Sequence, residues 1–382
     1  MKNQWVLIIL LFTCITEGCI KEEAANSEAD IIECTLTGNV LNRLAEIGND
    51  SITLTVKEGT DLTKLAPLLK LTPGATVEPI SGMVQDFSKV QYYIVTSEDR
   101  QWSKRYAIRV VSSGITTTED IIKFDFEFWK KKNIGTNYYP VFYETGDQGE
   151  ILFDWASGNA GFALTGMATE MEEYPTHWSP EGHSGGCVEL ITRSTGSFGA
   201  MAQKPLAAGN MFLGTFDFSK ALSTPLYATL FGIQFEYEPI SLSGWMDYQP
   251  GDVFYTFDKT SSTGLKPMPG QSDQCAIYAA LYEVSEDVPY LTGADAPIKE
   301  NPHVVCYAEI DESLQKGTHG WTYFEIPFKT LDGRTLDYEK LQEGRYNLTV
   351  VFSSSTNGAT FEGAVGSRLK VDDIKITINK IH

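Results

Sequence analysis

Three tryptophans beyond residue 150 stand beside polar residues, in segments rich in Gly, Pro, Asn and Ser. Flat aromatic faces match the apolar side of a pyranose ring, and Asp, Asn and His side chains can hydrogen-bond to its hydroxyls. Loop positions favour exposure, because connecting segments run over the surface of a domain. We therefore expect a carbohydrate-binding surface here, with packing as the alternative for each tryptophan. The candidate residues are Trp155, Asn159, His177, Trp178, Trp245, Asp247 and Tyr248.

Catalytic residues do not stand out in the same way. Glycoside hydrolysis needs two carboxylates about 5 Å or about 6.5–9.5 Å apart, and none of the thirty-six acids of residues 114–382 lies in a motif that marks it. Glu236 and Glu238 lie on one side of a predicted strand, as exposed acids often do. The histidines show no H-E-x-x-H spacing, and Gly-His-Ser-Gly-Gly at 182–186 is not a nucleophile elbow. We expect non-catalytic binding; the alternatives are a glycoside hydrolase or an adhesin or structural protein that contacts another surface protein.

Negative charge is concentrated in the C-terminal part of the chain. The sequence has 30 Lys and Arg against 50 Asp and Glu, a formal charge of −20. Residues 1–30 hold two bases and five acids (−3), residues 31–113 nine of each (0), and residues 114–382 nineteen bases and thirty-six acids (−17). Each phosphate contact of a nucleic acid needs a Lys or Arg, so nucleic acid is not an expected partner. The contrast between the last two parts predicts two domains, in a chain long enough for two cores.

The first thirty residues have the pattern of an export signal. Lys2 precedes an apolar run over residues 5–12, which is too short to span a membrane but suits a signal peptide. Gly18 then stands directly before Cys19, and Lys21-Glu22-Glu23 follow. This stretch resembles the signal and export tag of Bacteroidetes surface lipoproteins, in which the cysteine is acylated; an ordinary secreted protein is the alternative. The resemblance implies a signal peptide over 1–18, lipidation of Cys19, an acidic tether over 19–30, and attachment to the outer membrane through lipid only, exposed at the cell surface.

Residues 31–113 alternate apolar and polar side chains with the period of β-strands. The clearest runs are 51–56, 91–96 and 105–111, and Thr72-Pro73-Gly74-Ala75 is a turn signal. Several short strands without a helix predict a small antiparallel sandwich. The segments 52–56, 61–67, 73–79, 86–88, 93–99 and 104–110 together resemble an immunoglobulin-like module of Bacteroidetes surface lipoproteins. The resemblance implies that this Ig-like domain acts as a spacer.

Residues 114–382 also read as strands separated by turns rich in Gly, Pro, Ser and Asp. About ten strands over this length predict a larger double-sheet jelly roll, so the fold class is all-β. A helical turn is expected at 338–342. The main strand-like runs are 123–129, 188–192, 210–216, 230–235, 276–282, 321–326, 346–352 and 369–376.

Several segments of this second region resemble the putative carbohydrate metabolism domain found at the C-terminus of Bacteroidetes lipoproteins. They are residues 155–162, 209–214, 232–235, 239–251 and 366–374. The family implies sugar handling without a particular reaction, on a jelly roll similar to carbohydrate-binding modules. In such jelly rolls the first and last strands often share a structural calcium ion. By that resemblance Glu127 and Asp372 are the expected calcium ligands, with solvent-facing acids as the alternative.

Four cysteines of the folded part show no spacing typical of a zinc site. They are Cys34, Cys187, Cys275 and Cys306. The last two stand within strand-like runs, so the sequence favours buried free thiols.

Overall fold

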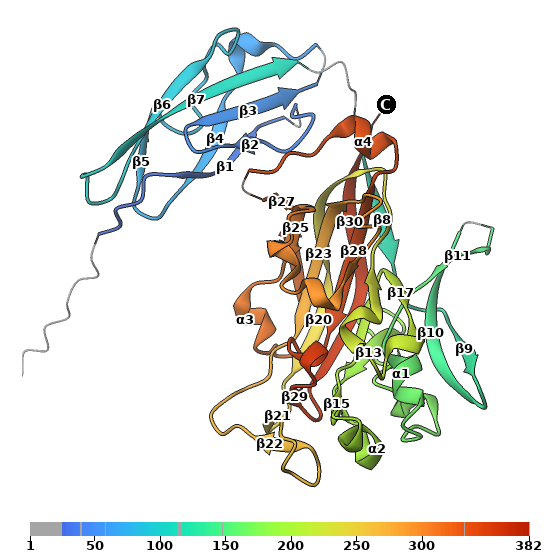
Figure 1. The fold of residues 1–382 in the computed structure, drawn as a ribbon. Helices are drawn as coiled ribbons and strands as arrows, with labels where there is room; N and C mark the ends of the chain where they lie inside the picture. Colours follow the sequence, from blue (N-terminus) through green and yellow to red (C-terminus); the bar gives the residue numbers. More distant parts are fainter. Residues whose placement is uncertain are drawn as a thin grey trace, which may run out of the picture.

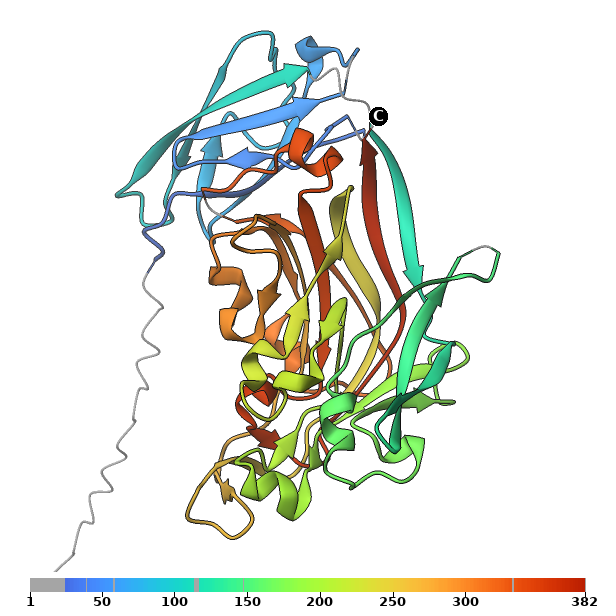
Figure 2. The same cartoon turned by 45° about the vertical axis from the view of Figure 1, so that its right-hand side comes forward.

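The computed structural model describes residues 25–38, 40–57, 59–112, 117–146, 148–331 and 333–381. The predicted signal peptide and Cys19 lie outside these residues. The described chain forms two β-sandwiches with four short helices, as Figures 1 and 2 show. The predicted all-β fold is therefore confirmed. In the part of the chain that the structure describes, no helix is both long and apolar enough to cross a membrane.

The first sandwich consists of a five-stranded and a two-stranded sheet. Strands β3 and β7 run parallel, and the other pairs are antiparallel. Leu54, Tyr93 and Ile108 are fully buried between the sheets. The five-stranded sheet has the order β2 (Glu46–Ile47), β3 (Ser51–Val56), β7 (Ser103–Ser112), β6 (Gln91–Thr96) and β5 (Thr76–Glu78), and the smaller sheet pairs β1 (Ile31–Leu36) with β4 (Pro67–Leu71).

The last residues of the tether expected over 19–30 belong to the first sandwich. Asn26 donates its backbone N–H to Glu98, and Ala29 is buried in the first core. Asp30 forms a salt bridge with Lys104. The sequence is polar and acidic here, but backbone hydrogen bonds and one ion pair fasten it to the sheet.

The second sandwich is larger and is built from two six-stranded sheets. The first sheet has the order β12 (Thr176–Ser179), β13 (Cys187–Ile191), β30 (Arg368–Ile381), β20 (Glu238–Gln249) and β26 (Thr322–Pro327), and β8 (Thr117–Phe124) also pairs with β30. The second sheet has the order β16 (Asn210–Phe212), β28 (Tyr346–Ser353), β23 (Ala276–Glu283), β25 (Val304–Glu309) and β27 (Lys329–Thr330), and β19 (Ile233–Gln234) also pairs with β28. We call these the front sheet and the back sheet.

The main core lies between the front and back sheets. Met246 and Val371 point inward from the front sheet and meet Ile277, Leu281 and Phe352 from the back sheet. The other face of β23 is buried too, because alternate residues such as Tyr282 belong to a second apolar cluster. A strand covered on both faces reads as a nearly continuous apolar run, as residues 276–282 do.

Smaller sheets and short helices surround this sandwich. The sheet β9–β10–β11 projects from its right side in Figure 1. The helix predicted at 338–342 is present as α4. The smaller strands are β9 (Trp129–Ile134), β10 (Asn137–Thr145), β11 (Ile151–Asp154), β14 (Arg193–Ser194), β15 (Leu206–Ala207), β17 (Gly214–Phe216), β18 (Thr229–Phe231), β21 (Phe254–Phe257), β22 (Leu265–Pro267), β24 (Leu291–Thr292) and β29 (Gly363–Ala364), and the helices are α1 (Asn159–Ala163), α2 (Gly196–Met201), α3 (Glu312–Gln315) and α4 (Tyr338–Gln342).

The strand predicted over 123–129 is interrupted. Strand β8 ends at Phe124, and Phe126 has a backbone φ of 55°. A positive φ breaks the regular alternation of a strand. Phe124 and Phe126 still reach the core, but Phe128 is 46% exposed instead of sharing their face.

The first sandwich docks on the end of the second that carries α4, as Figures 1 and 2 show. Glu238, at the start of β20, is 1% exposed and accepts hydrogen bonds from Leu44 of the first domain and from Tyr338 and Asn379 of the second. The guanidinium of Arg43 lies 5.4 Å from the centre of the Tyr338 ring. A buried carboxylate thus joins the two domains.

Candidate functional site

The outer face of the front sheet carries polar and aromatic side chains. Successive side chains of a strand point to opposite faces, and in β20 Met246 and Tyr248 are fully buried in the core. Trp245 and Asp247 therefore project from the opposite face. Across the ladder Trp245 is paired with Tyr323 and Asp372, and Asp247 with Lys370.

Four aromatic rings gather on this face, and we call them the aromatic face: His183, Trp245, Trp321 and Tyr323. The His183 ring stacks on Trp245 with centroids 3.9 Å apart and an interplanar angle of 11°. Trp321 meets His183 edge-on at 6.1 Å, and Tyr323 lies 5.5 Å from Trp245 at 61°. Tyr323 is 48% exposed. The cluster is a rigid aromatic surface that is in part open to solvent.

The loop that carries His183 is held by the two predicted calcium ligands. Glu127 accepts a hydrogen bond from the backbone N–H of Gly186 at 2.8 Å, and Asp372 accepts one from Ser184 at 2.9 Å. Asp373 lies 3.0 Å from Nδ1 of His183. Burial raises the pKa of Asp372, against the backbone hydrogen bonds that lower it. These carboxylates thereby set the position of the imidazole on Trp245.

The structure brings Glu127 and Asp372 to the same loop, as calcium binding would require. Calcium takes six to eight oxygen ligands, whereas the described residues contain no cluster of three or more His, Cys, Asp and Glu side chains suited to a metal. The backbone N–H groups that face both carboxylates already balance part of their charge. Backbone carbonyls of the loop would have to supply the remaining ligands, so calcium at this position stays a prediction.

Charged groups border the aromatic face. Lys370 is 4% exposed and donates to Glu181 at 2.6 Å. This ion pair lowers the pKa of Glu181. Asp247 accepts a hydrogen bond from Thr318 at 3.1 Å. The rings thus lie beside the carboxylates of Asp247 and Glu181, which can hydrogen-bond to hydroxyls.

Four of the predicted sugar-binding residues are buried, which corrects their expected role. Trp155 is 2% exposed, packs edge-on against Phe124 and Phe126, and donates from Nε1 to Glu144 at 2.8 Å. A ring enclosed in this way offers no face to a sugar. The other three are Asn159, His177 and Tyr248. Asn159 donates to the carbonyls of Pro140 and Thr176, and Tyr248 donates to the carbonyl of Ser354. Nε2 of His177 lies 3.4 Å from the carboxylate of Glu189.

Trp178 occupies an intermediate position. It is paired with Val188 and therefore shares the inward face of the front sheet, where it packs against the main core. Its Nε1 is buried without a hydrogen-bond partner in the described structure. Of the predicted set, Trp245 and Asp247 are the two that lie together on the outer face.

The sequence-based prediction did not include His183, Trp321 or Tyr323. Trp321 opens the strand-like run 321–326; it is half-buried and lies on the outer face. The i, i+2 spacing of Trp321 and Tyr323 is a signal that two aromatic rings share one face of a strand. No local pattern indicates that His183, about sixty residues from Trp245, stacks on it.

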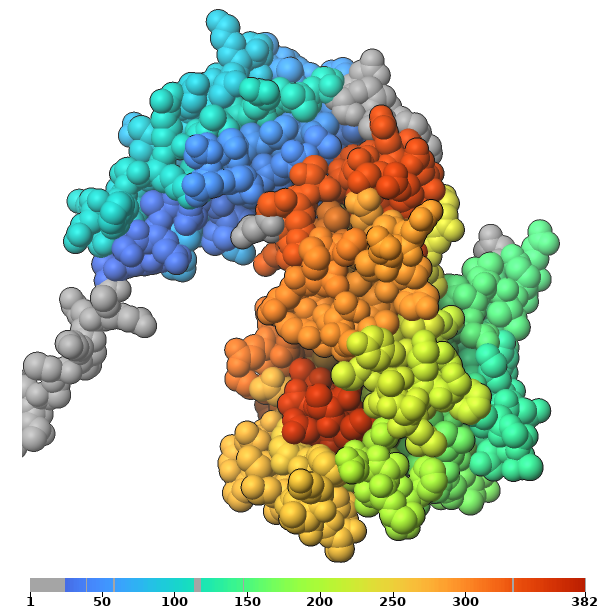
Figure 3. All heavy atoms as spheres, in the orientation of Figure 1, coloured from blue at the N-terminus to red at the C-terminus, as the bar shows by residue number. Residues whose placement is uncertain are grey.

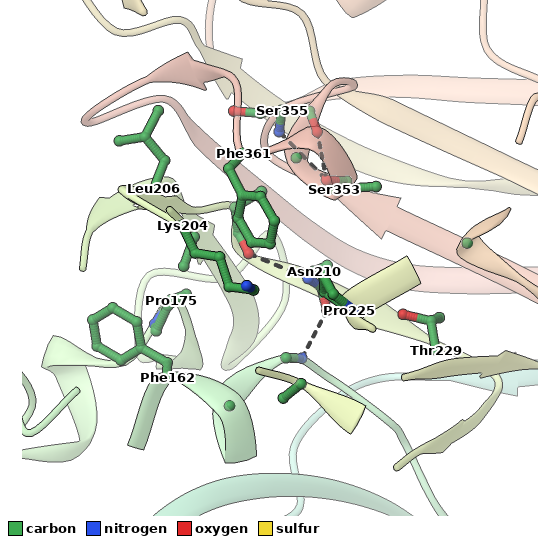
Figure 4. Close-up of a pocket in the computed structure, with 18 of the residues that line it drawn as sticks. Phe162, Pro175, Lys204, Leu206, Asn210, Pro225, Thr229, Ser353, Ser355 and Phe361 are labelled. Atoms are coloured by element: carbon green, nitrogen blue, oxygen red, sulfur yellow. Dashed lines mark hydrogen bonds between the residues drawn. The ribbon is translucent and has the colours of Figure 1, made fainter. Parts of the chain in front are cut away.

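A second feature, an apolar groove, lies outside the back sheet. Its volume is about 250 Å³. Figure 4 shows Phe162, Leu206, Asn210 and Phe361 among its walls, with Lys204 between the rings of Phe361 and Phe162 in this view. Phe198 and Leu222 also line it and are 38% and 46% exposed, so the groove opens to solvent. In Figure 3 the red, yellow-green and green segments that form these walls meet on the visible face.

One wall of the groove is fixed by a buried carboxylate. Asp273 is 1% exposed and accepts hydrogen bonds from Ser355, Ser367 and the backbone of Ala364 at 2.6–2.7 Å. Burial raises the pKa of Asp273, against these hydrogen bonds that lower it. The turn from Ser355 to Phe361 is thus tied to the sandwich.

The four cysteines of the folded part are free and buried, as predicted. Burial raises the pKa of the Cys34, Cys187 and Cys306 thiols to about 12. A thiol with so high a pKa is a poor nucleophile, so none of these three residues is a catalytic candidate.

Comparison with known proteins agrees with the family resemblances of the two folded parts of the chain. Residues 125–377 match the family described as "Putative carbohydrate metabolism domain", and residues 31–110 match the family described as "SGBP, N-terminal". No curated protein matches the chain.

Two crystal structures of similar proteins extend the comparison. A protein from Bacteroides thetaiotaomicron VPI-5482, described as a putative glycoside hydrolase, is 42% identical over 93% of this chain and 98% of its own, with a TM-score of 0.60. A second one from Bacteroides vulgatus ATCC 8482, with the same description, is 40% identical over 67% of this chain and 97% of its own, with a TM-score of 0.61. The family match covers more than half of the sequence, so the chain belongs to the putative carbohydrate metabolism domain family.

Proposed function

We propose that this protein binds carbohydrate at the cell surface without cleaving it, and that the aromatic face holds the sugar. The single observation that carries the proposal is the gathering of Trp245, Trp321 and Tyr323 beside His183 on the outer face of the front sheet. The family to which the chain belongs supports a carbohydrate ligand.

The chemistry of the aromatic face suits a glycan chain. Tyr323 offers an exposed ring to the apolar face of a pyranose, and Asp247 and Glu181 offer oxygen atoms to its hydroxyls. Rings that are already packed against one another lose little conformational entropy when a ligand binds. An exposed sheet face suits an extended chain better than a single small sugar.

The location of the protein is part of the same proposal. Cys19, preceded by Gly18 and followed by Lys21-Glu22-Glu23, would carry the lipid that anchors the chain to the outer membrane. The N-terminal sandwich then serves as a spacer that carries the acidic second domain away from the membrane. The match of this sandwich to the SGBP N-terminal family supports a position at the cell surface.

A glycan array followed by calorimetry on residues 25–382 tests the proposal, because this range contains both cores. We expect Tyr323→Ala to lower the affinity for the bound glycan about tenfold, as loss of one central aromatic contact does. Trp102→Ala is the matched control, because Trp102 is 65% exposed on the first domain. A chain that binds no glycan on the array, or that binds equally well after Tyr323→Ala, would contradict the proposal.

Glycoside hydrolysis is the second candidate, and one residue favours it. Burial raises the pKa of Glu144 to about 7, against the hydrogen bond from Trp155 that lowers it, and the charge of Asp125 raises it further. A carboxyl group that holds its proton near neutral pH is what a general acid needs. Turnover of a polysaccharide that disappears in Glu144→Gln, with binding retained, would establish hydrolysis in place of non-catalytic binding.

A further inference from the structure

The apolar groove differs in charge from the domain around it. Residues 114–382 carry a net charge of −17 with thirty-six acids, yet no Asp or Glu is among the described residues that line the groove. Lys204 is the one charged side chain among them. A lining that excludes acids in so acidic a domain favours a ligand that is apolar and carries negative charge.

Lys204 is placed to receive that charge. Its Nζ donates to the carbonyl of Ala202 at 3.1 Å and lies 5.7 Å from the centre of the Phe361 ring. An ammonium group has three N–H donors, of which the bond to Ala202 uses one. Figure 4 shows the side chain of Lys204 extending among the groove residues. The remaining donors can therefore meet an anion inside the groove.

The walls define the rest of the ligand. Six phenylalanines line the groove: Phe162, Phe198, Phe212, Phe216, Phe231 and Phe361. A cavity of roughly 150 Å³ accepts benzene, so a volume of about 250 Å³ has room for a body of roughly ten heavy atoms. Burial of such a body among phenylalanine rings supplies the hydrophobic part of the affinity.

We propose that the groove binds an amphipathic monocarboxylate, with its carboxylate on Lys204 and its apolar body among the phenylalanines. This site lies outside the back sheet, whereas the aromatic face lies outside the front sheet, so the two proposals are independent. A bare sugar suits the groove poorly, because its hydroxyls would lose water next to apolar walls. Hydrolysis of a glycosidic bond does not fit here either, since it needs a pair of carboxyl groups.

Calorimetry of residues 25–382 with octanoate and octan-1-ol tests the proposal. The two probes share an apolar chain and differ in charge. We expect octanoate to bind one per chain with a Kd of about 0.1–1 mM, typical of a ligand with about ten heavy atoms, and octan-1-ol to bind about tenfold more weakly, because it lacks the charged hydrogen bond.

Variants locate the binding. Lys204→Met keeps the apolar stem and removes the charge, so it should lower octanoate affinity about tenfold and leave octan-1-ol unchanged. Lys220→Met is the matched control on the same domain, because Lys220 does not line the groove and should leave both affinities unchanged. Ala359→Trp places an indole at the exposed rim and should weaken both probes. Leu222→Asp serves the same purpose from the other wall if Ala359→Trp does not fold.

Three results would overturn the proposal: no binding of octanoate, equal binding of octanoate and octan-1-ol, or octanoate binding that Lys204→Met and the rim variants leave unchanged. Glycan binding by the aromatic face should be the same in wild type and Lys204→Met. The failure of one proposal therefore does not decide the other.

Discussion

Glu238 offers a direct test of how the two domains are joined. Its carboxylate is 1% exposed and accepts hydrogen bonds from Leu44 N at 3.1 Å, Tyr338 Oη at 2.7 Å and Asn379 Nδ2 at 2.9 Å. Glu238→Ala leaves these three donors buried without an acceptor. Each such donor costs about 1–3 kcal/mol, and the loss of a buried charge offsets part of that sum.

We therefore expect Glu238→Ala to lower the free energy of unfolding by about 3–5 kcal/mol, because three buried donors lose their acceptor at about 1–3 kcal/mol each and the removed charge offsets part of that cost. Glu238→Gln should cost much less, about 1 kcal/mol, the size of one hydrogen bond. Its amide oxygen can still accept from Leu44 and Tyr338, and a rotated Asn379 amide can accept from its new N–H group. Urea unfolding measures both changes, and small-angle scattering should show a larger radius of gyration for Glu238→Ala as the domains separate.

The same contact predicts a dependence on pH. Burial raises the pKa of Glu238 above its ordinary value of 4.5, against hydrogen bonds from Asn379, Tyr338 and Leu44 that lower it. Above pH 4.5 the folded state then holds this proton more tightly than the unfolded chain does. The stabilisation from protonation is complete below pH 4.5 and is lost as the pH rises through the folded-state pKa.

Comparison with Glu238→Gln isolates this slope, because glutamine does not titrate. The stability of wild type relative to Glu238→Gln should fall as the pH rises from 4.5. Equal slopes in the two proteins, or an unchanged radius of gyration in Glu238→Ala, would refute the assignment of Glu238 as the buried link between the domains.

Three further predictions concern the second domain. Burial raises the pKa of Glu144 to about 7, so the indole N–H signal of Trp155 in NMR should shift with a midpoint near pH 7, and Glu144→Gln should abolish this shift. The stability that protonated Glu144 contributes to the fold should be lost as the pH rises through the same value. Asp273→Ala should destabilise the domain by about 2–4 kcal/mol, because several buried donors lose their acceptor, and it should also weaken octanoate binding; unchanged octanoate affinity would show that Asp273 does not hold the groove wall. If calcium binds at Glu127 and Asp372, a free concentration one hundred times Kd should stabilise the protein by about 2.7 kcal/mol, and Asp372→Asn should remove this gain in a thermal melt.

The sequence by itself determined the local elements well. Strands β3 and β6 begin and end where the alternation of residues 51–56 and 91–96 predicts, and α4 matches the helical turn predicted at 338–342. The alternation of apolar and polar residues shows which face of a strand is buried. This pattern can be read from residues that are adjacent in the sequence. The contrast between a neutral and an acidic part predicted two domains, and the described residues form one large apolar cluster in each part.

The tertiary structure alone decided which aromatic residues are available to a ligand. Trp155 stands in a loop-like segment, but Phe124 of β8, Phe126 just after β8 and Phe352 of β28 enclose it. Trp245 becomes part of a surface because β26 brings Tyr323 beside it and the loop at 182–186 lays His183 on its ring. Exposure of a side chain depends on what packs over it, and contacts between residues about 30 to 200 positions apart leave no mark in a local pattern. The apolar groove with its one lysine is likewise a product of the tertiary structure, because segments between residues 158 and 361 come together to form its walls.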